Sequence, residues 1–253
     1  MPPSLRALLT RLIDYAGLYP PAALPISEAA ENYGRYLHSS ECWILNRLVL
    51  AGAKLGEVEL GDHWRVTLLV DEEPGTLPKQ VETLETKGAR RLSLPTYCEA
   101  PIDRISGGGF AKLRAGGLTP DAIPPSDEIA DFLCAAVARR IPFKATAGLH
   151  HPIRSERPLT YAPDSPRAVM HGFVNVFLAA SFAWHGMDCA ALTDLLNETD
   201  PENFRFLDGA VRWRGQTLST AQVAGARREF AHSFGSCSFE EPVTDLRQLG
   251  WLA

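Results

Sequence analysis

The stretch Phe143-Lys-Ala-Thr-Ala-Gly-Leu-His-His-Pro152 joins a short apolar-rich segment to a polar end. Alternate side chains of a β-strand share a face, so Lys144 and Thr146 lie on one side and Phe143 and Ala145 on the other. The apolar side is suited to packing under helices. The basic side then faces an interior, which is the pattern of a strand in an α/β barrel.

A second segment, Phe110-Ala-Lys-Leu-Arg-Ala-Gly-Gly117, repeats this pattern. Lys112 and Arg114 share one face, and small apolar residues occupy the other. Gly116 and Gly117 follow at the strand end, where their backbone amides can approach a ligand closely. If the two segments are neighbouring strands, their basic groups meet in one small volume.

The rest of the chain alternates short apolar runs with helical patterns, which favours a parallel sheet with crossover helices. We expect strands at Leu45–Ala51, Val66–Val70, Arg91–Leu94, Phe110–Arg114, Phe143–Ala147 and Phe234–Phe239. We expect helices at Leu5–Tyr15, Ser27–Leu37, Leu77–Lys87, Ser126–Arg140, Ala168–Trp184, Cys189–Leu196, Thr220–Ala231 and Pro242–Leu249.

These patterns predict an α/β fold of the TIM-barrel type. Asp208-Gly209 lies between alternating segments and predicts a β-hairpin over Phe204–Trp213. Only five or six barrel strands are recognisable, so the sequence leaves open a barrel that is incomplete or irregular in its second half. With 253 residues we expect a single domain, 1–253, whose N-terminal segment of about 40 residues is helical.

Composition and charge indicate which partners and which cellular compartment to expect. The formal net charge is -5, so a nucleic-acid partner is not expected. The longest apolar run, Gly172–Trp184, is too short to span a bilayer. The five cysteines form no CxxC pair, so neither a disulfide scaffold nor a structural zinc site is expected. We therefore expect a reduced, cytoplasmic protein with a small-molecule substrate, and a homo-oligomer is left open.

The clustered cations need a negative partner, because burying unpaired charge is costly. That partner is either a protein carboxylate such as Asp71 or Glu99, or the carboxylate or phosphate of a substrate. One reading is a structural ion-pair network inside the barrel. Because the basic residues lie at strand ends beside Gly116 and Gly117, we favour a ligand site.

Lysine chemistry is the leading hypothesis for that site. A cation beside Lys144 is expected to lower its pKa, which suits a Schiff-base nucleophile or an electrostatic catalyst. Lys112, His150 or His151 would transfer protons. Substrate-binding candidates are Arg114, Gly116, Gly117, Thr146, Asn175, Ser236 and Ser238. The two strands resemble the lysine strands of class I aldolases, which implies a lyase acting on a small anionic carbonyl compound.

Two alternatives belong to other classes. His150 or His151, His171 and Glu99 could bind zinc or manganese in a metal-dependent hydrolase or isomerase. Their spacing matches no standard metal motif, and no nucleotide-binding pattern occurs, so no cofactor is favoured although a divalent metal is possible. The other alternative is a barrel that binds a small ligand without turning it over.

Two further segments are unusual in composition. Phe234-Gly-Ser-Cys-Ser-Phe-Glu-Glu-Pro242 offers Ser236 and Ser238 as an anion cradle before a helix, whereas Cys237 is expected to be a packed residue. Asp14-Tyr-Ala-Gly-Leu-Tyr-Pro-Pro21 is an aromatic loop in which the tyrosines are expected to pack and Asp14 is a weak polar candidate.

The phrases DYAGLYPPAAL, KLRAGG, FKATAGLHHP, HGFVN and FGSCSFEEP together resemble a family of uncharacterised bacterial proteins. The likeness runs from Asp14 to Leu249. It implies no particular activity, so it adds no mechanism to the one argued from the residues.

Overall fold

Eight parallel strands close into a barrel in the computed structural model, which describes residues 1–105 and 108–252. Around the barrel the order is β1, β13, β7, β6, β5, β4, β3, β2. The strands are β1 (Ile13–Tyr15), β2 (Leu45–Ala51), β3 (Val66–Leu69), β4 (Val81–Lys87), β5 (Thr96–Glu99), β6 (Phe110–Arg114), β7 (Phe143–Thr146) and β13 (Ala231–Ser236). This confirms the TIM-barrel-like α/β fold and shows that the barrel is complete.

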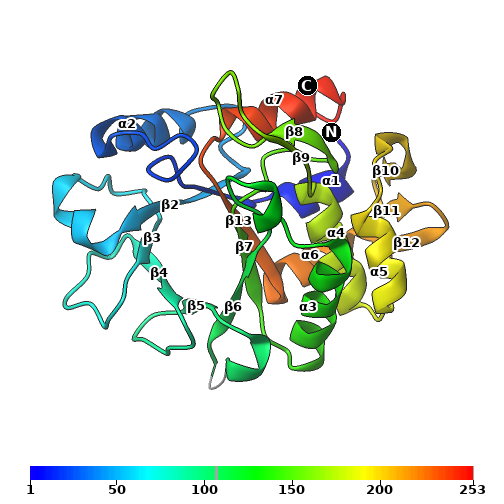
Figure 1. Ribbon diagram of the computed structural model, residues 1–253, viewed down its shortest axis with the longest axis horizontal. Helices are drawn as coiled ribbons and strands as arrows, with labels where there is room; N and C mark the ends of the chain where they lie inside the picture. Colours follow the sequence, from blue (N-terminus) through cyan, green and yellow to red (C-terminus); the bar gives the residue numbers. More distant parts are fainter. Residues whose placement is uncertain (106–107, 253) are drawn as a thin grey trace.

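Seven α-helices are found among the described residues (Figure 1). They are α1 (Pro3–Leu9), α2 (Ile26–Tyr36), α3 (Ser126–Ala138), α4 (Phe173–Trp184), α5 (Cys189–Leu196), α6 (Thr220–Glu229) and α7 (Glu240–Gln248). Short 3-10 turns are η1 (Gly52–Glu57), η2 (Ile102–Arg104), η3 (Pro120–Ala122) and η4 (Pro201–Asn203).

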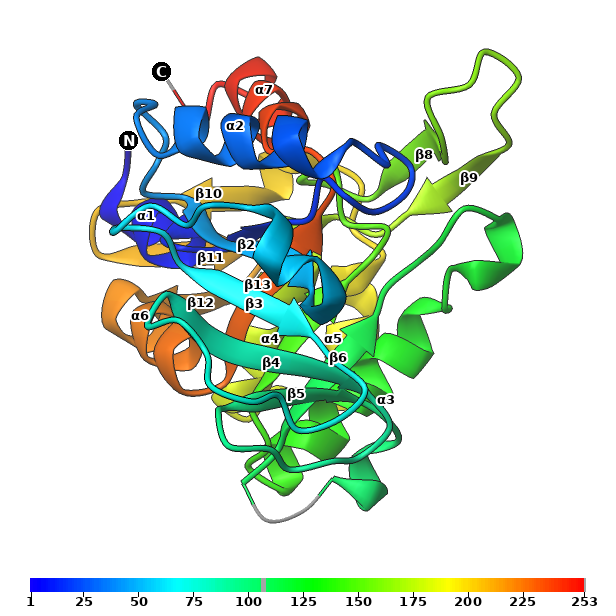
Figure 2. The ribbon, with the colours of Figure 1, turned by 90° about the vertical axis from the view of Figure 1, so that its left-hand side faces the viewer.

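The helices are distributed unevenly around the barrel. Helices α3 to α6 lie on the side of β6, β7 and β13, whereas the four connections from β2 to β6 contain no α-helix in their described residues (Figure 2). Helix α4 is apolar on every side and almost wholly buried. Its Phe173 stacks on Phe234 of β13, with ring centroids 5.1 Å apart, so the outward faces of the strands carry the apolar core.

Two small antiparallel sheets stand outside the barrel. The predicted hairpin is confirmed as β10 (Phe204–Phe206) and β11 (Ala210–Trp213), and β12 (Gln216–Ser219) adds a third strand. The second sheet pairs β8 (Ser155–Pro158) with β9 (Arg167–Met170). Figure 2 shows this second hairpin projecting from the barrel.

Two predictions for the barrel wall were wrong. The segment Leu77–Lys87, expected to be a helix, contains strand β4, because Val81 and Leu84 are buried between β3 and β5 and pairing with both strands overrides the helical preference of its glutamates. The segment Arg91–Leu94, expected to be a strand, does not form one. Strand β5 begins after Pro95 instead, where Thr96, Tyr97 and Cys98 are buried.

Three element boundaries also differ. The helix expected over Leu5–Tyr15 ends at Leu9, and β1 follows Arg11, whose φ of 49° lies in the left-handed region and breaks the helix. The helix expected from Ala168 begins only at Phe173, after β9. The last barrel strand is Ala231–Ser236 rather than Phe234–Phe239.

The cysteines do not all remain free, contrary to expectation. Cys134 of α3 and Cys189 of α5 form a disulfide across a sequence separation of 55 residues. Cys42, Cys98 and Cys237 are free. Within the described residues, no helix combines the length and apolarity needed to cross a membrane.

Candidate functional site

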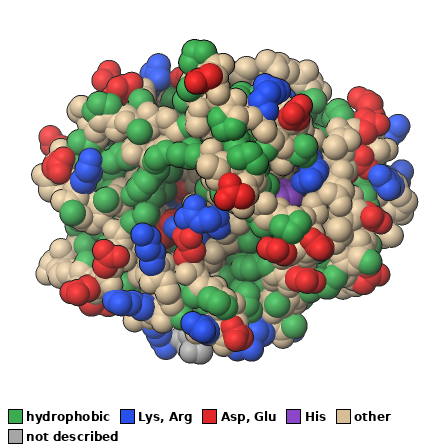
Figure 3. All heavy atoms as spheres, in the orientation of Figure 1, with side chains coloured by type: hydrophobic (Ala, Val, Ile, Leu, Met, Phe, Trp, Pro, Cys, Tyr) green, Lys and Arg blue, Asp and Glu red, His purple; other side chains and the backbone are tan. Residues whose placement is uncertain are grey.

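A pocket of about 340 Å³ opens at the C-terminal ends of the barrel strands. Figure 3 shows basic and acidic side chains gathered beside a hollow on this face, with hydrophobic surface around it. The lining residues are Ala16, Tyr19, Pro20, Pro21, Val49, Leu69, Glu85, Lys112, Arg114, Gly117, Leu118, Lys144, Thr146, Ala147, Gly148, His150, Leu159, Met170, Gly235 and Cys237.

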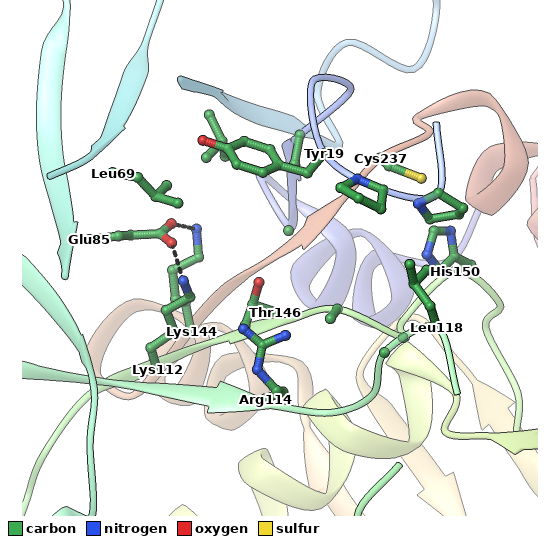
Figure 4. A pocket seen from close by; sticks show the side chains of 18 of the residues that line it. Tyr19, Leu69, Glu85, Lys112, Arg114, Leu118, Lys144, Thr146, His150 and Cys237 are labelled. Atoms are coloured by element: carbon green, nitrogen blue, oxygen red, sulfur yellow. Dashed lines mark hydrogen bonds and ion pairs between the residues drawn. The ribbon is translucent and has the colours of Figure 1, made fainter. Parts of the chain in front are cut away.

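The predicted alternation of side chains places the basic groups together. Strands β6 and β7 are parallel neighbours whose register pairs Lys112 with Lys144 and Arg114 with Thr146. All four residues line the pocket (Figure 4). The position of these inward-facing residues is therefore confirmed.

Glu85 of β4 binds both lysines. Its Oε1 lies 2.5 Å from Nζ of Lys144, and its Oε2 lies 2.8 Å from Nζ of Lys112. Lys112 also lies 3.3 Å from Oε2 of Glu99. One carboxylate thus joins the two ammonium groups in the wall of the pocket, as the dashed lines in Figure 4 show.

Asp14 of β1 binds Lys144 on its other side. Oδ2 accepts hydrogen bonds from Nζ of Lys144 and from Oγ of Ser233, the latter at 2.8 Å. Oδ1 accepts from Nδ2 of Asn46 at 2.6 Å and from the backbone amide of Arg47 at 3.3 Å. Burial alone would raise the pKa of Asp14, but attraction to Lys144 and these hydrogen bonds leave it below its ordinary value.

The protein itself supplies the balancing charge. Three cations (Lys112, Lys144 and Arg114) meet three carboxylates (Asp14, Glu85 and Glu99), and Nε of Arg114 lies 2.8 Å from Glu99. Of the two partners named from the sequence, Glu99 takes part. Asp71 is exposed and has no ion pair among the described residues. A substrate anion is not needed to neutralise this cluster.

The expected lowering of the Lys144 pKa is wrong. Burial alone would lower it, but Asp14 and Glu85 outweigh that effect and raise the pKa above its ordinary value. The side chain is only 1% exposed, and both neighbours stabilise its charged form. Lys144 is therefore a protonated ammonium in the unliganded protein rather than a free amine.

The two adjacent histidines have different surroundings. Nδ1 of His150 donates to Oε2 of Glu241 at 3.0 Å, and His150 lines the pocket. Nδ1 of His151 donates to Oδ2 of Asp245 at 2.6 Å, but His151 is buried away from the lining. Both carboxylates belong to α7. Only His150 is placed to exchange a proton with a ligand.

Tyr19 contributes a polar group that the sequence did not single out. Its hydroxyl is buried in the pocket wall and has no hydrogen-bond partner among the described residues. Burial raises the pKa of Tyr19 to about 12, so the group stays protonated. An unpaired buried hydroxyl is costly, and a polar group of a ligand would satisfy it.

The remaining predicted binding residues divide between lining and support. Gly117 lines the pocket, whereas a Cβ on Gly116 would lie 2.9 Å from Cα of Gly148, so Gly116 packs two strand ends together. Ser236 is buried and its Oγ accepts from the amide of Ser238 at 3.4 Å. Oγ of Ser238 accepts from the amide of Glu241 at 3.1 Å, so both serines bond to backbone amides at the start of α7.

Asn175 and His171 are also structural and lie away from the pocket. Nδ2 of Asn175 donates to the backbone oxygens of Leu195 and Glu198, at 2.9 and 2.8 Å. Nε2 of His171 lies 2.7 Å from the backbone oxygen of Pro124, and its Nδ1 lies 3.1 Å from Arg154. His171 precedes α4, so it does not lie on the helix that the sequence predicts from Ala168.

The alternative metal site is not assembled. No group of three or more histidine, cysteine, aspartate or glutamate side chains in the described ranges is arranged to hold a metal ion. Glu99 is occupied by Arg114 and Lys112, and His150 by Glu241. Cys237 lines the pocket, but burial raises the pKa of its thiol, which disfavours a thiolate.

Three carboxylates were missed or undervalued. Glu85 lies in a segment that the sequence predicts to be helical, and Glu241 lies in a segment where only the serines and Cys237 are candidates. Asp14 is only a weak polar candidate in the sequence, because it lies in a loop rich in aromatic residues and prolines. One consideration points to Asp14 and Glu85 from the sequence. Each inward-facing lysine needs an anionic partner, and another strand of the barrel can supply it.

No family model, no curated protein and no solved structure matches this chain. The function is therefore argued from the pocket alone.

Proposed function

We propose that the protein is a lyase of the aldolase type, which acts on a small carbonyl compound through a Schiff base on a barrel lysine. The observation that carries the proposal is the lysine pair of β6 and β7, bridged by Glu85 in a pocket at the C-terminal barrel end. Active sites of such barrels lie at this end. A pocket of about 340 Å³ suits a small metabolite.

Lys112 is the better nucleophile of the pair. Its side chain is 7% exposed against 1% for Lys144, and its contacts with Glu85 and Glu99 are longer than those of Lys144. Lys144 is enclosed by two carboxylates that favour its charged form. We assign Lys144 an electrostatic role, in which it keeps Glu85 ionised beside the reacting amine.

The first step balances without an outside reagent. Glu99 takes one proton from the Lys112 ammonium, and the free amine adds to the substrate carbonyl carbon. The resulting carbinolamine loses its hydroxyl as water, with the proton returned by Glu99. An ammonium and a carbonyl thus become a protonated imine and water. The imine then accepts the electron pair of the carbon–carbon bond that breaks.

His150 is placed to manage the second proton. Because Nδ1 donates to Glu241, the neutral ring presents Nε2 as an acceptor, and the residue lines the same pocket. It would take the proton of the substrate hydroxyl as the bond breaks, and return one to the product. His151 is not used in this scheme.

The other lining groups would hold the substrate. Arg114 is half exposed at the pocket and uses Nε for Glu99, so its terminal nitrogens can bind a substrate carboxylate or phosphate. Thr146 and the backbone of Gly117 lie nearby in the lining. The hydroxyl of Tyr19 would donate to a substrate oxygen, which gives that group the partner it lacks.

We propose that the protein acts on a small molecule and has no nucleic-acid or membrane partner. The step needs no cofactor, because the protonated imine formed on the lysine accepts the electron pair. Homo-oligomer formation is left open. The cytoplasmic location stays a prediction, and the Cys134–Cys189 disulfide weighs against it, since disulfides are rare in that compartment.

Reductive trapping tests the proposal. The protein is incubated with a panel of short aldehydes, 2-oxo acids and sugar phosphates in the presence of borohydride, and its intact mass is measured. We expect one adduct per chain with a matching compound. Lys112→Met should abolish it, and Lys79→Met, which changes an exposed lysine paired with Asp62, should leave it unchanged.

Two results would overturn the proposal. One is an adduct that forms equally in Lys112→Met and Lys144→Met, which would indicate unspecific surface labelling. The other is saturable binding of a carbonyl compound in the pocket with neither adduct nor turnover, which would favour the non-catalytic binding protein.

A further inference from the structure

A second pocket, of about 620 Å³, lies at the opposite end of the barrel from the proposed active site. Its lining comes from the N-terminal ends of the strands, including Arg47 of β2, Glu82 of β4 and His232 of β13. Tyr97 also lines it, and its ring centroid lies 5.7 Å from Nζ of Lys144. The side chain of Tyr97 therefore stands between the two pockets.

The charge of this second pocket is strongly one-sided. Its lining holds five arginines, of which Arg11, Arg47 and Arg65 lie together at the strand ends, and Glu82 is the only carboxylate among the described lining residues. Glu82 already binds two of these three arginines, with contacts of 2.9 Å to Nε of Arg47 and 2.8 Å to Arg65.

Arg11 contacts no anion among the described residues. It is exposed at the pocket, and no ion pair or hydrogen bond of its guanidinium is found in the part of the chain that the structure describes. Repulsion from Arg65, followed by partial burial, lowers its pKa. Three arginines are thus held close together around an open volume with one carboxylate, Glu82, among them. This excess of positive charge is unfavourable unless a further anion binds.

A buried arginine adds to the same positive field. Nε of Arg227 donates to the backbone oxygen of Leu8 at 2.8 Å, Nη1 to that of His232 at 2.6 Å, and Nη2 to that of Thr10 at 3.2 Å. Its partners are neutral carbonyls, and no carboxylate contacts it among the described residues. His232 cannot add charge near neutral pH, because burial and Arg227 lower its pKa to about 4.

We infer that this N-terminal pocket binds a small, multiply charged oxyanion, such as a phosphate ester, a diphosphate or a polycarboxylate. Arg11 and Arg47 would supply the contacts, because arginine forks match the paired oxygens of phosphate and carboxylate groups. Arg65 uses Nε and Nη2 for Glu82 and Nη1 for Asn46, so it adds positive charge beside the ligand. Nε of Arg47 is used by Glu82, which leaves its terminal nitrogens for the ligand. The inference goes beyond the proposed lyase activity and does not depend on it.

Calorimetric titration tests this inference. Sodium pyrophosphate and sodium citrate are each titrated into the protein, with sodium chloride of equal ionic strength as the reference. We expect one saturable site for at least one of the two anions, and the preferred anion identifies the ligand as phosphate-bearing or carboxylate-bearing. The substitutions Arg11→Asn and Arg65→Gln should each weaken binding about tenfold, since each removes a positive charge from the pocket.

Arg11→Asn is the variant least able to disturb the fold, because asparagine tolerates the left-handed backbone at this position. Arg35→Gln is the matched control, since it removes an arginine that is 62% exposed and paired with Glu240 outside the pocket. Circular dichroism checks that each variant is folded.

Three outcomes would overturn the inference. The first is the absence of saturable binding of both anions beyond the chloride reference. The second is equal affinity in the wild type, Arg11→Asn and Arg65→Gln. The third is binding that is lost in Arg114→Gln but kept in Arg65→Gln, which would place the anion in the C-terminal pocket. Reductive trapping at Lys112 is measured separately, so failure of either proposal leaves the other standing.

Discussion

Lys112 and Lys144 face each other at paired positions of β6 and β7, and each holds a different oxygen of the Glu85 carboxylate. The two lysines are therefore not independent groups. A change at Glu85 alters the charge balance of both, while a change at one lysine frees an oxygen that the other can use.

Replacement of Glu85 by glutamine should destabilise the fold. The amide keeps the shape of the side chain but leaves two buried ammonium groups with one carboxylate fewer. Breaking a buried ion pair of this kind costs about 3–5 kcal/mol. Urea unfolding measures the loss, and Glu59→Gln, at an exposed position, is the control. A Glu85→Gln protein as stable as the wild type would contradict the geometry given for this cluster.

The same carboxylates predict a dependence of stability on pH. For Glu85, as for Asp14, burial alone would raise the pKa, but Lys144 and the other partners leave it below the ordinary value, which is 4.5 for Glu85 and 3.8 for Asp14. A lowered pKa stabilises the folded state above the ordinary value, and that contribution is lost as the pH falls through the lowered one.

We therefore expect the free energy of unfolding to fall steeply below about pH 4.5. Urea unfolding at a series of pH values from neutral to acidic measures this slope. In Glu85→Gln the slope should be shallower, because one of the two groups no longer titrates. Parallel curves for the two proteins would show that Glu85 does not carry the effect.

Tyr19→Phe should slow adduct formation without destabilising the fold. The hydroxyl of Tyr19 is buried without a partner among the described residues, so its removal should leave thermal stability unchanged or raise it by up to about 1 kcal/mol. If the hydroxyl binds the substrate oxygen, the rate of adduct formation should fall about tenfold or more. Thermal unfolding and trapping rates are measured on the same samples. A loss of stability with unchanged trapping would refute this role.

Thiol titration tests the disulfide. In denaturant without a reducing agent, three of the five cysteines should react, namely Cys42, Cys98 and Cys237. Reduction should release two more thiols and remove about 4 kcal/mol of stability, given the loop of 55 residues that Cys134–Cys189 closes. Cys42→Ser should show no such loss. Five reactive thiols before reduction would show that the bond is absent.

The sequence predicts those strands in which polar and apolar residues alternate clearly. Alternation alone placed Lys112, Arg114, Lys144 and Thr146 on one inner surface, since inward and outward positions differ sharply in polarity. It failed for β4, because Val81-Glu-Thr-Leu-Glu-Thr-Lys87 contains residues that favour helices and only pairing with β3 and β5 makes it a strand.

Partners of the functional residues were harder to predict than the residues themselves. Asp14 and Lys144 are 130 positions apart, and His151 and Asp245 are 94 apart, so only closure of the barrel brings each pair together. The predicted lowering of the Lys144 pKa is wrong for this reason. The neighbouring cation was visible in the sequence, whereas the two flanking carboxylates were not.

Peptide mapping of the borohydride-trapped protein tests the central claim most directly. After proteolysis, the added mass should reside on Lys112 at the inner face of β6, and the peptide carrying Lys144 should be unmodified. Modification confined to lysines outside the pocket, or no modification with any compound of the panel, would contradict the account of a barrel lysine as the reacting group.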